Sequence, residues 1–471
     1  MPSVIGVDSS TQSCKVLVVD LDSGVIVSEA TAPHPEGTEI HPEEWWTALC
    51  DALDRVDTST VSAVSIGGQQ HGLVALDEQG EVVRPALLWN DTRSAPQAEH
   101  ITAHFGAESM ALRTGSVPVA SFTATKLAWV KHHEPALAAR IAGVALPHDW
   151  LTWRLRGFGP RGRSRLGPQL DQLVTDRSDA SGTGYFSSIT NTYDAEILDF
   201  VLGHQPVLPR VLSAAEVAGT NERGWIVGPG GGDNAIAALG LDAQSGDVVM
   251  SLGTSGTVFA VTAKPAHDPS GTVAGFADAA GGFLPLIATL NASRAIDSVR
   301  QLLGMSWDDF SLAVNNSLPG SGGLTLLPFF DGERMPNLPD ATGLLAGMTR
   351  RNLTPDNMAR AAAEGVISNL SRGLEAISEQ TEPFTRLMLI GGGAQNAGVQ
   401  RVVSETVSLP VIVPHPGEYV AYGAARQAAW VLTGTRPRWT PSAQTLDSPG
   451  TSSPARDQFD ALLASDARRA L

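Results

Sequence analysis

The residues best suited to chemistry are a carboxylate preceded by three glycines, in the run Pro229-Gly230-Gly231-Gly232-Asp233-Asn234. The run follows a predicted strand at 225–227 and opens a predicted helix of small residues at 235–239. Glycines let a ligand approach the backbone, and the start of a helix favours negative charge beside it. Asp233 could therefore accept a proton from a hydroxyl group that attacks phosphorus, although the same position also suits a residue that only caps the helix.

Two further polar runs follow predicted strands in the first half of the chain. Gly67-Gly68-Gln69-Gln70-His71-Gly72 places several donors and acceptors on a turn, which suits binding to sugar hydroxyls. Trp89-Asn90-Asp91-Thr92-Arg93 combines an aromatic platform with an amide, a carboxylate and a guanidinium. A structural or solvated histidine and an ordinary surface loop are the alternative interpretations of these two runs.

Two distant segments share one pattern of strand, short turn and strand. Residues 4–11 read VIGVDSST and residues 249–256 read VMSLGTSG, and each segment runs on into a second apolar strand. An offset of 243 places Asp8 on Ser251, Ser10 on Gly253 and Thr11 on Thr254. Such turns present backbone N–H groups at close range, as a phosphate chain requires. The pattern predicts an internal duplication with a polyphosphate held between two half-molecules.

A third glycine turn, Gly391-Gly392-Gly393, lies between a predicted strand at 387–390 and a helix. A dinucleotide fingerprint would need a third glycine where Asn396 stands and an acidic residue after the next strand, which ends in Pro414-His415-Pro416 instead. No lysine follows the glycine spacing of a Walker loop. The turn is therefore interpreted as a nucleotide contact that belongs to neither of these motifs.

Composition limits the class of protein and its partners. A chain of 471 residues with 42% apolar residues predicts a globular enzyme of two domains. A net charge of −17 argues against nucleic acid as a partner, and the four lysines leave an anionic ligand to backbone amides, arginine or metal. Cys14 and Cys50 make no disulfide framework, so a cytoplasmic location is expected. Neither an export signal nor a membrane span is indicated.

Short apolar runs alternate with longer amphipathic ones, which favours an α/β fold. Strands are predicted at 61–68, 86–89 and 411–413, and helices at 135–144 and from Pro355, capped by Thr354, to Ile377. The predicted domains are an N-terminal domain at 1–240, a C-terminal domain at 241–434 and a Pro/Ser-rich tail with a short helix at 435–471. An arginine-bearing insertion at 157–172 is interpreted as a mobile, solvated loop or a ligand-gripping one.

Taken together, the motifs resemble those of the FGGY carbohydrate kinases over nearly the whole chain, from Ile5 to about Leu432. The motifs that carry this resemblance stand in the family's order: the first hairpin with Asp8, Gln70-His71-Gly72, Trp89-Asn90-Asp91, Ser121-Phe122-Thr123-Ala124-Thr125-Lys126-Leu127-Ala128-Trp129, Asp176-Arg177-Ser178-Asp179-Ala180-Ser181, Gly232-Asp233-Asn234, Ser251-Leu252-Gly253-Thr254-Ser255, Gly343-Leu344-Leu345-Ala346-Gly347 through Glu364-Gly365, and Gly391-Gly392-Gly393. Gln70-His71-Gly72 and the Trp-Asn-Asp run are most similar to the members that phosphorylate xylulose.

The resemblance implies two actin-like ATPase (ribonuclease H-like) domains with a catalytic cleft between them, an N-terminal one for sugar and a C-terminal one for nucleotide. It also implies ATP-dependent phosphorylation of D-xylulose at the 5-hydroxyl, with magnesium, in a homodimer. The implied sites are Asp233 as general base; Gln70, His71, Trp89, Asn90, Asp91 and Asn234 at the sugar; Asp8 at magnesium through water; Ser9, Ser10, Thr11, Gln12, Gly253, Thr254 and Ser255 at the phosphates; and Gly392, Gly393 and Asn396, with Trp307 nearby, at adenosine.

Alternatives concern mainly the substrate, because spacing does not define the stereochemistry of hydroxyl contacts. L-xylulose, ribulose, gluconate and other polyols remain alternative substrates on the same fold. A non-catalytic sugar sensor or a chaperone-like ATPase is the alternative from another class. The sequence disfavours it, because Asp233 is present with its glycines and nothing after Gly434 is long enough for a peptide-binding domain. Ser10 stands where many family members have glycine, which makes the first phosphate turn less permissive.

Overall fold

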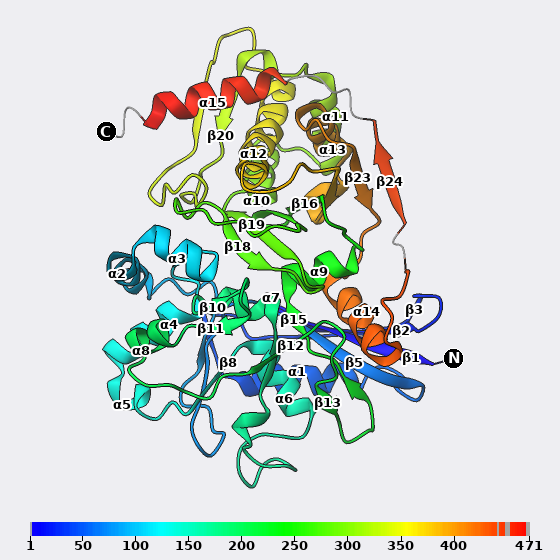
Figure 1. Cartoon of the computed structure of the whole chain (residues 1–471). Coiled ribbons are helices and arrows are strands. Elements are labelled where there is room, and N and C mark those ends of the chain that lie inside the picture. Colours follow the sequence, from blue (N-terminus) through cyan, green and yellow to red (C-terminus); the bar gives the residue numbers. More distant parts are fainter. Residues whose placement is uncertain (1, 440–441, 448–452, 468–471) are drawn as a thin grey trace. The chain divides into compact units, whose positions relative to one another are not determined.

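The computed structural model describes residues 2–439, 442–447 and 453–467. The chain forms two compact units (Figure 1). The first comprises Met1–Ala243, Ala263–Leu284 and Glu418–Thr440, and the second comprises Gln244–Thr262, Pro285–Gly417 and Pro441–Leu471. The first division thus falls close to the predicted boundary at 240, but two later segments return to the first unit. In the part of the chain that is described, no helix is both long and apolar enough to cross a bilayer.

The first unit is built on a mixed sheet. Its main path runs in the order β13 (Gly219–Thr220), β14 (Ile226–Val227), β5 (Val61–Gly68), β1 (Ser3–Ser9), β2 (Ser13–Asp20) and β3 (Ile26–Pro33), and β15 (Gly231–Gly232) also pairs with β5. β1, β14 and β15 are all parallel to β5, whereas β2 is antiparallel to β1. The carboxyl ends of β1, β5 and β15 therefore meet at one edge of the sheet.

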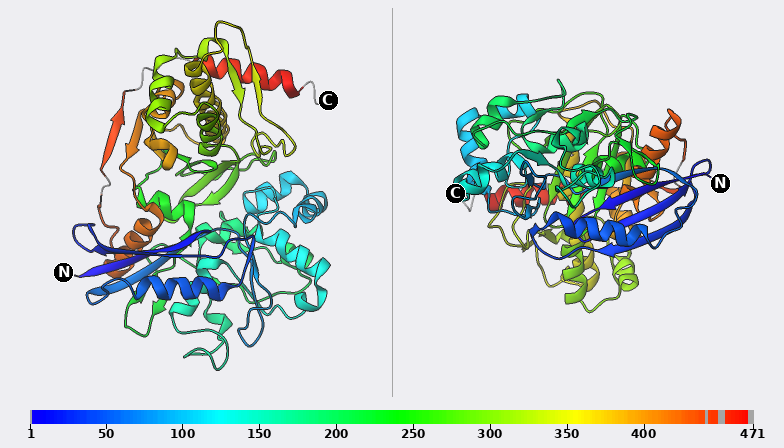
Figure 2. Two further views of the ribbon diagram at one scale, coloured as in Figure 1. Left: turned by 180° about the vertical axis from the view of Figure 1, so that it is seen from behind. Right: turned by 90° about the horizontal axis from the view of Figure 1, so that it is seen from below.

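Helices cover both faces of this sheet because apolar side chains alternate along its strands. Ile5, Val7, Val16 and Val18 pack with the face of α1 (Pro42–Leu53) that carries Trp45 and Leu49. Val4, Leu17, Val19 and Ala63 pack instead with alanines of α14 (Tyr419–Thr433). The two helices lie on opposite faces of the sheet (Figure 2).

The remaining helices and strands of the first unit surround this sheet. They are β4 (Glu39–Ile40), β6 (Val74–Leu76), β7 (Ala86–Leu87), α2 (Ala95–Phe105), α3 (Ala107–Thr114), α4 (Thr123–His133), α5 (Pro135–Ala138), β8 (Gly143–Ala145), α6 (Pro147–Leu155), β9 (Val174–Asp176), α7 (Arg177–Ala180), β10 (Phe186–Ser187), β11 (Thr192–Tyr193), α8 (Ala195–Val201), β12 (Arg210–Leu212), α9 (Asp233–Gly240) and β18 (Ala274–Ala277).

The second unit repeats the order of the first sheet, which confirms the internal duplication. Its strands run in the order β19 (Phe283–Thr289), β17 (Gly256–Ala260), β16 (Asp247–Leu252), β22 (Arg386–Ile390), β23 (Val411–Pro414) and β24 (Ala443–Leu446). β16 and β17 form an antiparallel hairpin, and β16, β22 and β23 are parallel. β20 (Thr325–Leu327) and β21 (Leu344–Ala346) form a separate pair. The predicted α/β fold of two ribonuclease H-like units is therefore present.

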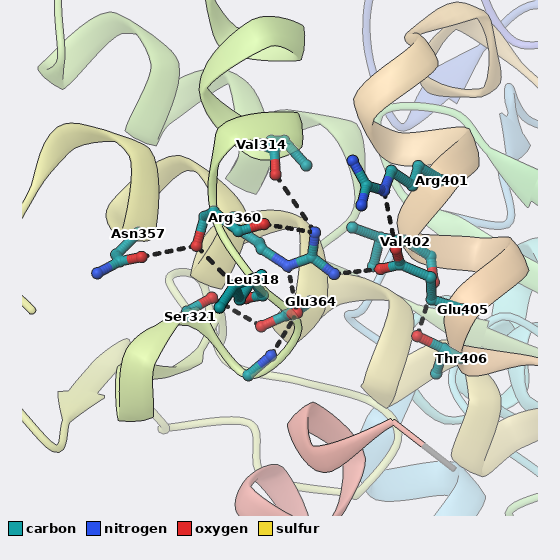
Figure 3. A network of polar contacts seen from close by, with 12 residues as sticks. Val314, Leu318, Ser321, Asn357, Arg360, Glu364, Arg401, Val402, Glu405 and Thr406 are labelled. Carbon is teal, nitrogen blue, oxygen red and sulfur yellow. Dashed lines mark hydrogen bonds and ion pairs between the residues drawn. The ribbon is translucent and has the colours of Figure 1, made fainter. Parts of the chain in front are cut away.

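A buried ionic network joins three helices of the second unit, α11 (Trp307–Asn316), α12 (Pro355–Ser378) and α13 (Ala397–Thr406) (Figure 3). Arg360, only 1% exposed, donates to Glu364 over 2.7 Å, to Glu405, and to the carbonyls of Val314 and Ser317. A buried charge is tolerable only when its donors are paired, as they are here. The network fixes α11 and α13 against α12. α10 (Ser293–Leu302) also packs on α12.

The structure corrects one predicted helix, and it also describes the insertion and the predicted helix of the tail. The helix predicted at 135–144 is wrong beyond Ala138, because Gly143–Ala145 pairs with β6 as strand β8. The insertion at 157–172 is hydrogen-bonded through Arg161 N to Gln79 O at 3.0 Å. In the tail, α15 (Pro454–Ala467) places Phe459 in a core with Leu327 and Phe329. The tail residues 440–441, 448–452 and 468–471 lie outside the described residues.

Candidate active site

The carboxylates of Asp8 and Asp233 lie on either side of the end of β5. Gly67 of β5 pairs with Asp8 of β1 along one side and with Gly231 of β15 along the other, and Asp233 follows β15 directly. Ligands of α/β sheets bind where parallel strands end at their carboxyl edge. The glycines make this approach possible, since a Cβ at Gly232 would lie 2.7 Å from the Gln70 amide nitrogen.

Asp233 is the first residue of α9, as the sequence predicts, but its side chain does not cap the helix in the usual way. The Asp233 Oδ1 atom accepts hydrogen bonds from the Asn234 backbone N at 2.7 Å and from Asn234 Nδ2 at 2.9 Å. This leaves Oδ2 as the oxygen that could take a proton. Burial, and then the negative charge of Asp8, raise the pKa of Asp233 to about 7, against the opposing bonds from Asn234. A carboxylate with this pKa suits general base catalysis near neutral pH.

His71 is held in place by an unusual backbone conformation and by the contacts of its ring. Its φ of 71° is unusual for a residue other than glycine and indicates strain of the kind found at ligand sites. Nδ1 donates to the Gly182 carbonyl over 2.7 Å, which assigns the lone pair of the neutral ring to Nε2. The ring packs against Phe122 and Phe276 at centroid distances of 4.9 and 5.5 Å.

Phe276 is a residue that sequence reasoning missed. It lies in β18, within the Ala263–Leu284 segment that returns to the first unit, far along the chain from His71. Ser181 and Gly115 hold the segment in place by accepting hydrogen bonds from the backbone N–H groups of Ala277 and Gly275. No local pattern marks Phe276, because only the returning chain brings it beside the histidine.

Several buried polar atoms at the end of β1, after β5 and in the Trp89-Asn90-Asp91 run find no hydrogen-bond partner among the described residues. They are Ser9 Oγ, Gln69 Oε1 and Nε2, Gln70 Nε2 and Asn90 Oδ1. Gln69 and Gln70 are only 1% and 5% exposed, and Gln70 Oε1 accepts from Asn234 Nδ2 at 3.4 Å. Buried polar groups are normally satisfied, so these atoms indicate that polar ligands bind here.

The structure places Trp89, Asn90 and Asp91 in different surroundings. Trp89 Nε1 donates to Thr11 Oγ1 over 2.9 Å and so connects the aromatic run to the first turn. Asp91 is instead engaged by the Thr38 hydroxyl at 2.8 Å and by Arg93. Burial tends to raise the pKa of Asp91, but the hydrogen bonds from Arg93 and Thr38 outweigh it and lower the pKa. The Asp91 carboxylate therefore stabilises its loop.

The first hairpin turn lies next to charged side chains, and hydrogen bonds fix its backbone. Ser10 Oγ donates to Asp8 Oδ1, and the Ser10 carbonyl accepts from the His34 ring at 2.8 Å. Lys15 stands opposite Asp8 on β2 and pairs with Glu418 at 2.6 Å. Burial raises the pKa of Asp8 to about 6, although the Ser10 hydrogen bond and the Lys15 charge oppose the shift.

Oxygen ligands at this turn fit a magnesium ion. Mg²⁺ takes oxygen ligands, keeps several waters, and is usually bound through one or two carboxylates together with substrate phosphates. The Asp8 carboxylate, with the unpartnered Ser9 hydroxyl beside it in sequence, provides such a donor set. Gln12 supplies its backbone carbonyl to His34 N at 2.8 Å, which helps to fix the turn.

In the second unit, the turn Gly253-Thr254-Ser255 lies beside the glycine turn at the ends of β16 and β22. A Cβ at Gly391 would lie 2.6 Å from the Leu252 carbonyl carbon, and one at Gly393 would contact Ser293. Gly392 is exposed, and a Cβ there would meet no atom of the described residues within 4 Å. These turns give an open, amide-rich surface of the kind that phosphates and nucleosides bind.

Asn396 and Trp307 also come together in this unit. Asn396 caps α13, and its Nδ2 donates to the Trp307 carbonyl over 3.1 Å. The Trp307 ring is 42% exposed and stacks with the Arg300 guanidinium at 4.9 Å. A partly exposed aromatic ring near a glycine turn is suited to contact with a base, so Trp307 is kept as a candidate residue for adenosine.

A buried cluster of charged side chains next to Gly230 was not predicted. His148, Asp149 and Asp179 are at most 1% exposed, with His148 Nδ1 2.6 Å from Asp179 Oδ2 and His148 Nε2 3.2 Å from Asp149 Oδ1. Burial alone would lower the pKa of His148, but the two carboxylates outweigh it and raise the pKa. Ser178, next to Asp179, accepts from Gly232 N at 3.2 Å and so supports the strand before Asp233.

Comparisons with known proteins agree with this geometry. The chain matches the FGGY family of carbohydrate kinases, with the N-terminal domain at residues 3–247 and the C-terminal domain at 248–432. A xylulose kinase of Streptomyces rubiginosus is 49% identical over 94% of this chain and 92% of its own, and one of Haemophilus influenzae is 31% identical over 90% of each. The crystal structure of xylulose kinase from Bifidobacterium adolescentis superposes with a TM-score of 0.91 at 40% identity, covering 98% of this chain and 99% of that one.

Proposed function

This chain belongs to the FGGY family of carbohydrate kinases, and we propose that it transfers the γ-phosphoryl group of ATP to the 5-hydroxyl of D-xylulose, with Asp233 as the general base. The observation that carries the proposal is the pair Asp8 and Asp233 at the end of β5, where Asp233 has a pKa of about 7. The xylulose kinases to which the chain is similar support the choice of sugar.

In the proposed mechanism, the Gln70 amide and the His71 imidazole bind ketose hydroxyls in the first unit. Both lie at the edge where Asp233 is held, and buried groups left unpaired by the wrong sugar would penalise it strongly. Asp233 Oδ2 takes the proton of the 5-hydroxyl as that oxygen bonds to the γ-phosphorus. The bond from this phosphorus to the bridging oxygen breaks, and ADP leaves with the electron pair.

The nucleotide is assigned to the turns of both halves of the duplication. Ser9, Ser10, Thr11 and Gln12 in the first unit, and Gly253, Thr254 and Ser255 in the second, offer backbone N–H groups and hydroxyls to phosphate oxygens. Gly392, Gly393 and Asn396 are proposed to line the adenosine. Magnesium held near Asp8 through water would neutralise phosphate charge during the transfer.

Variants of Asp233 test the assignment of the base. Removing a positioned general base commonly costs roughly 10²- to 10⁴-fold in rate, so Asp233→Ala and Asp233→Asn should bind D-xylulose but lose most turnover. Asp20→Asn is the matched control, because Asp20 is buried at the far end of β2 and accepts from Ser23. Turnover of the Asp233 variants equal to that of the control would show that the base is another group.

A sugar panel tests the substrate. Release of ADP is measured with D-xylulose, L-xylulose, ribulose, gluconate and glycerol, and D-xylulose is expected to give the highest kcat/KM. Calorimetry with D-xylulose, with and without a non-hydrolysable ATP analogue, measures binding independently of turnover. Phosphorylation of gluconate or glycerol alone would exclude the ketose assignment while leaving the kinase chemistry intact.

Location and assembly are proposed from the cysteines and from the family resemblance. Both cysteines are free thiols in the structure, which suits a reducing cytoplasm. A homodimer is proposed from the family resemblance, with no nucleic acid and no membrane as partners. Light scattering after size-exclusion chromatography tests the dimer, and a monomeric mass at assay concentration would exclude it.

A further inference from the structure

The strand before Asp233 contains a bulge next to β5. Val227 lies opposite Val64, and Gly231 lies opposite Gly67, so four residue steps on one strand face three on the other. The extra residue separates β14 from β15, and the interruption falls just before the glycines that lead to Asp233. Bulges of this kind are frequent next to active sites, where they re-aim a side chain.

Gly230 is the residue at which the bulge departs most from a regular strand. Its φ is +82°, and a Cβ there would contact the His148 ring and the Ile66 carbonyl. The backbone N–H and C=O groups of Gly230 are buried, so each needs a partner other than water. An unsatisfied pair at this point would leave the segment before Asp233 poorly held.

Gln427, on α14, satisfies both groups with one side chain. Gly230 N donates to Gln427 Oε1 over 3.0 Å, and Gln427 Nε2 donates to Gly230 O over 3.0 Å. Because a backbone N–H only donates and a carbonyl only accepts, this pair of bonds fixes the orientation of the amide. The buried Ser65 hydroxyl also donates to Gln427 Oε1, from the part of β5 that faces the bulge.

α14 also contacts α9, the helix that begins at Asp233. Helix α9 crosses α14 at Gly240 and Gly423, where a Cβ on Gly423 would contact the Ile236 carbonyl. Arg426, next to Gln427, donates to the Leu239 carbonyl at 3.0 Å. Asp233 thus lies between two segments that one helix from the C-terminal part of the chain supports.

We propose that Gln427 is a positioning residue for the phosphoryl transfer: by pairing with Gly230 it fixes the bulge and so aims the Asp233 carboxylate at the sugar hydroxyl. The inference rests on the proposed role of Asp233. It assigns to α14 a task that no motif in the sequence indicates, because the two partners are 197 residues apart.

The test compares Gln427→Leu with a control on the same helix. Leucine has a similar size but leaves both Gly230 groups unpaired. Thr433→Val is the control, because the Thr433 hydroxyl bonds to Ala429 and Thr435 within and after α14. A displacement of about 1 Å can cost on the order of 10²-fold in rate, so kcat of Gln427→Leu should fall roughly 10- to 100-fold, with KM for sugar and ATP nearly unchanged.

Hydrogen exchange supplies a readout that does not depend on the role of Asp233. The peptide covering 228–234 should exchange faster in Gln427→Leu than in Thr433→Val, since the Gly230 N–H has lost its acceptor. If Gln427→Leu does not fold, Gln427→Met, whose flexible side chain fills the same space, replaces it.

The outcomes separate the two proposals. Faster exchange at 228–234 together with reduced kcat supports the positioning role. Unchanged kcat relative to Thr433→Val, with or without faster exchange, overturns it. Undiminished turnover by Asp233→Ala overturns the base assignment instead, whatever Gln427→Leu does.

Discussion

The two hairpin turns descend from one pattern, yet they use different chemistry. In the first unit, Ser9 pairs with Cys14 and the turn contains four residues, whereas in the second Leu252 pairs with Gly256 and the turn contains three. The uniform offset of 243 therefore holds for β1 and β16 but slips by one residue after the turn. A longer turn gives the first unit room for an additional side chain.

Their surroundings differ in charge as well as in length. The first turn is bordered by Asp8, Lys15 and Glu418, and the His34 ring holds its backbone. In the second turn the carbonyls of Gly253 and Thr254 accept from the first N–H groups of α10, and the place of Asp8 is taken by Ser251. The second turn thus offers backbone and hydroxyl groups without a carboxylate.

The difference indicates that the two duplicated turns have different roles in binding. A carboxylate is needed once, to hold a cation, and a second one near the phosphates would repel them. In the second unit the glycine turn at 391–393 lies beside Leu252, at the start of the second hairpin turn. Its middle residue, Gly392, has room for a ligand to approach the backbone. We infer that the first turn supplies charge and the second supplies neutral donors.

Among the effects that bear on this comparison, the largest is expected from Asp8, and it separates the two tasks directly. Asp8→Asn keeps the size of the side chain but removes the charge that would hold magnesium, so turnover should fall about 10- to 100-fold and need more Mg²⁺. Ser251→Ala, at the equivalent position, should change turnover much less. Steady-state rates at several Mg²⁺ concentrations measure both variants, and equal losses in the two would contradict the division of tasks.

A stability comparison tests the glycine turn of the second unit. Gly391 has a φ of +94°, and its Cβ would lie 2.6 Å from the Leu252 backbone, so Gly391→Ala should lower the unfolding free energy by at least about 1–3 kcal/mol. A Cβ at Gly392 meets no atom within 4 Å in the described part of the chain, so Gly392→Ala should change the unfolding free energy by no more than about 0.5 kcal/mol. Thermal unfolding midpoints measure the difference. A similar loss in both variants would mean that the turn rearranges freely.

Local patterns made much of the fold predictable. The strand at 61–68 is β5, and Thr354 followed by Pro355 marks the start of α12, because capping and proline act within one turn of the chain. The close backbone approach before Asp233 was also predictable from the glycine run, since only glycine lets β15 lie so near Gln70. Such features depend on neighbours in sequence.

Contacts between distant segments could not be predicted in this way. Phe276 reaches His71 only because the chain returns to the first unit, and Gln427 reaches Gly230 from α14. His148 has one carboxylate partner beside it in sequence, Asp149, but gains the other, Asp179, from α7. One isolated sequence carries no periodic signal for such pairs, and the returning segments also make the units differ from a simple division at residue 240.

The pH dependence of turnover should follow the ionisation of Asp233. Asp233 must be ionised to act as a base, and its pKa is about 7, so kcat/KM for the sugar should fall as pH drops below 7. Asn234→Ala removes a hydrogen bond that lowers this pKa, and the acid limb should therefore move to higher pH. Profiles of kcat/KM from pH 5 to 9 measure the shift. An acid limb that stays in place or moves to lower pH would contradict the assignment.

The smallest expected effect concerns Ser10, which the offset aligns with Gly253 of the second turn. The Ser10 hydroxyl donates to Asp8 and lowers a pKa that burial has raised to about 6, so Ser10→Gly should raise the pKa of Asp8 further. More of Asp8 is then protonated at pH 6 to 7, and the Mg²⁺ concentration for half-maximal rate should rise a few-fold there. At pH 8.5 Asp8 is ionised in both proteins, so the difference should disappear. A loss independent of pH would instead mean that Ser10 shapes the turn, since altered backbone geometry does not depend on the charge of Asp8.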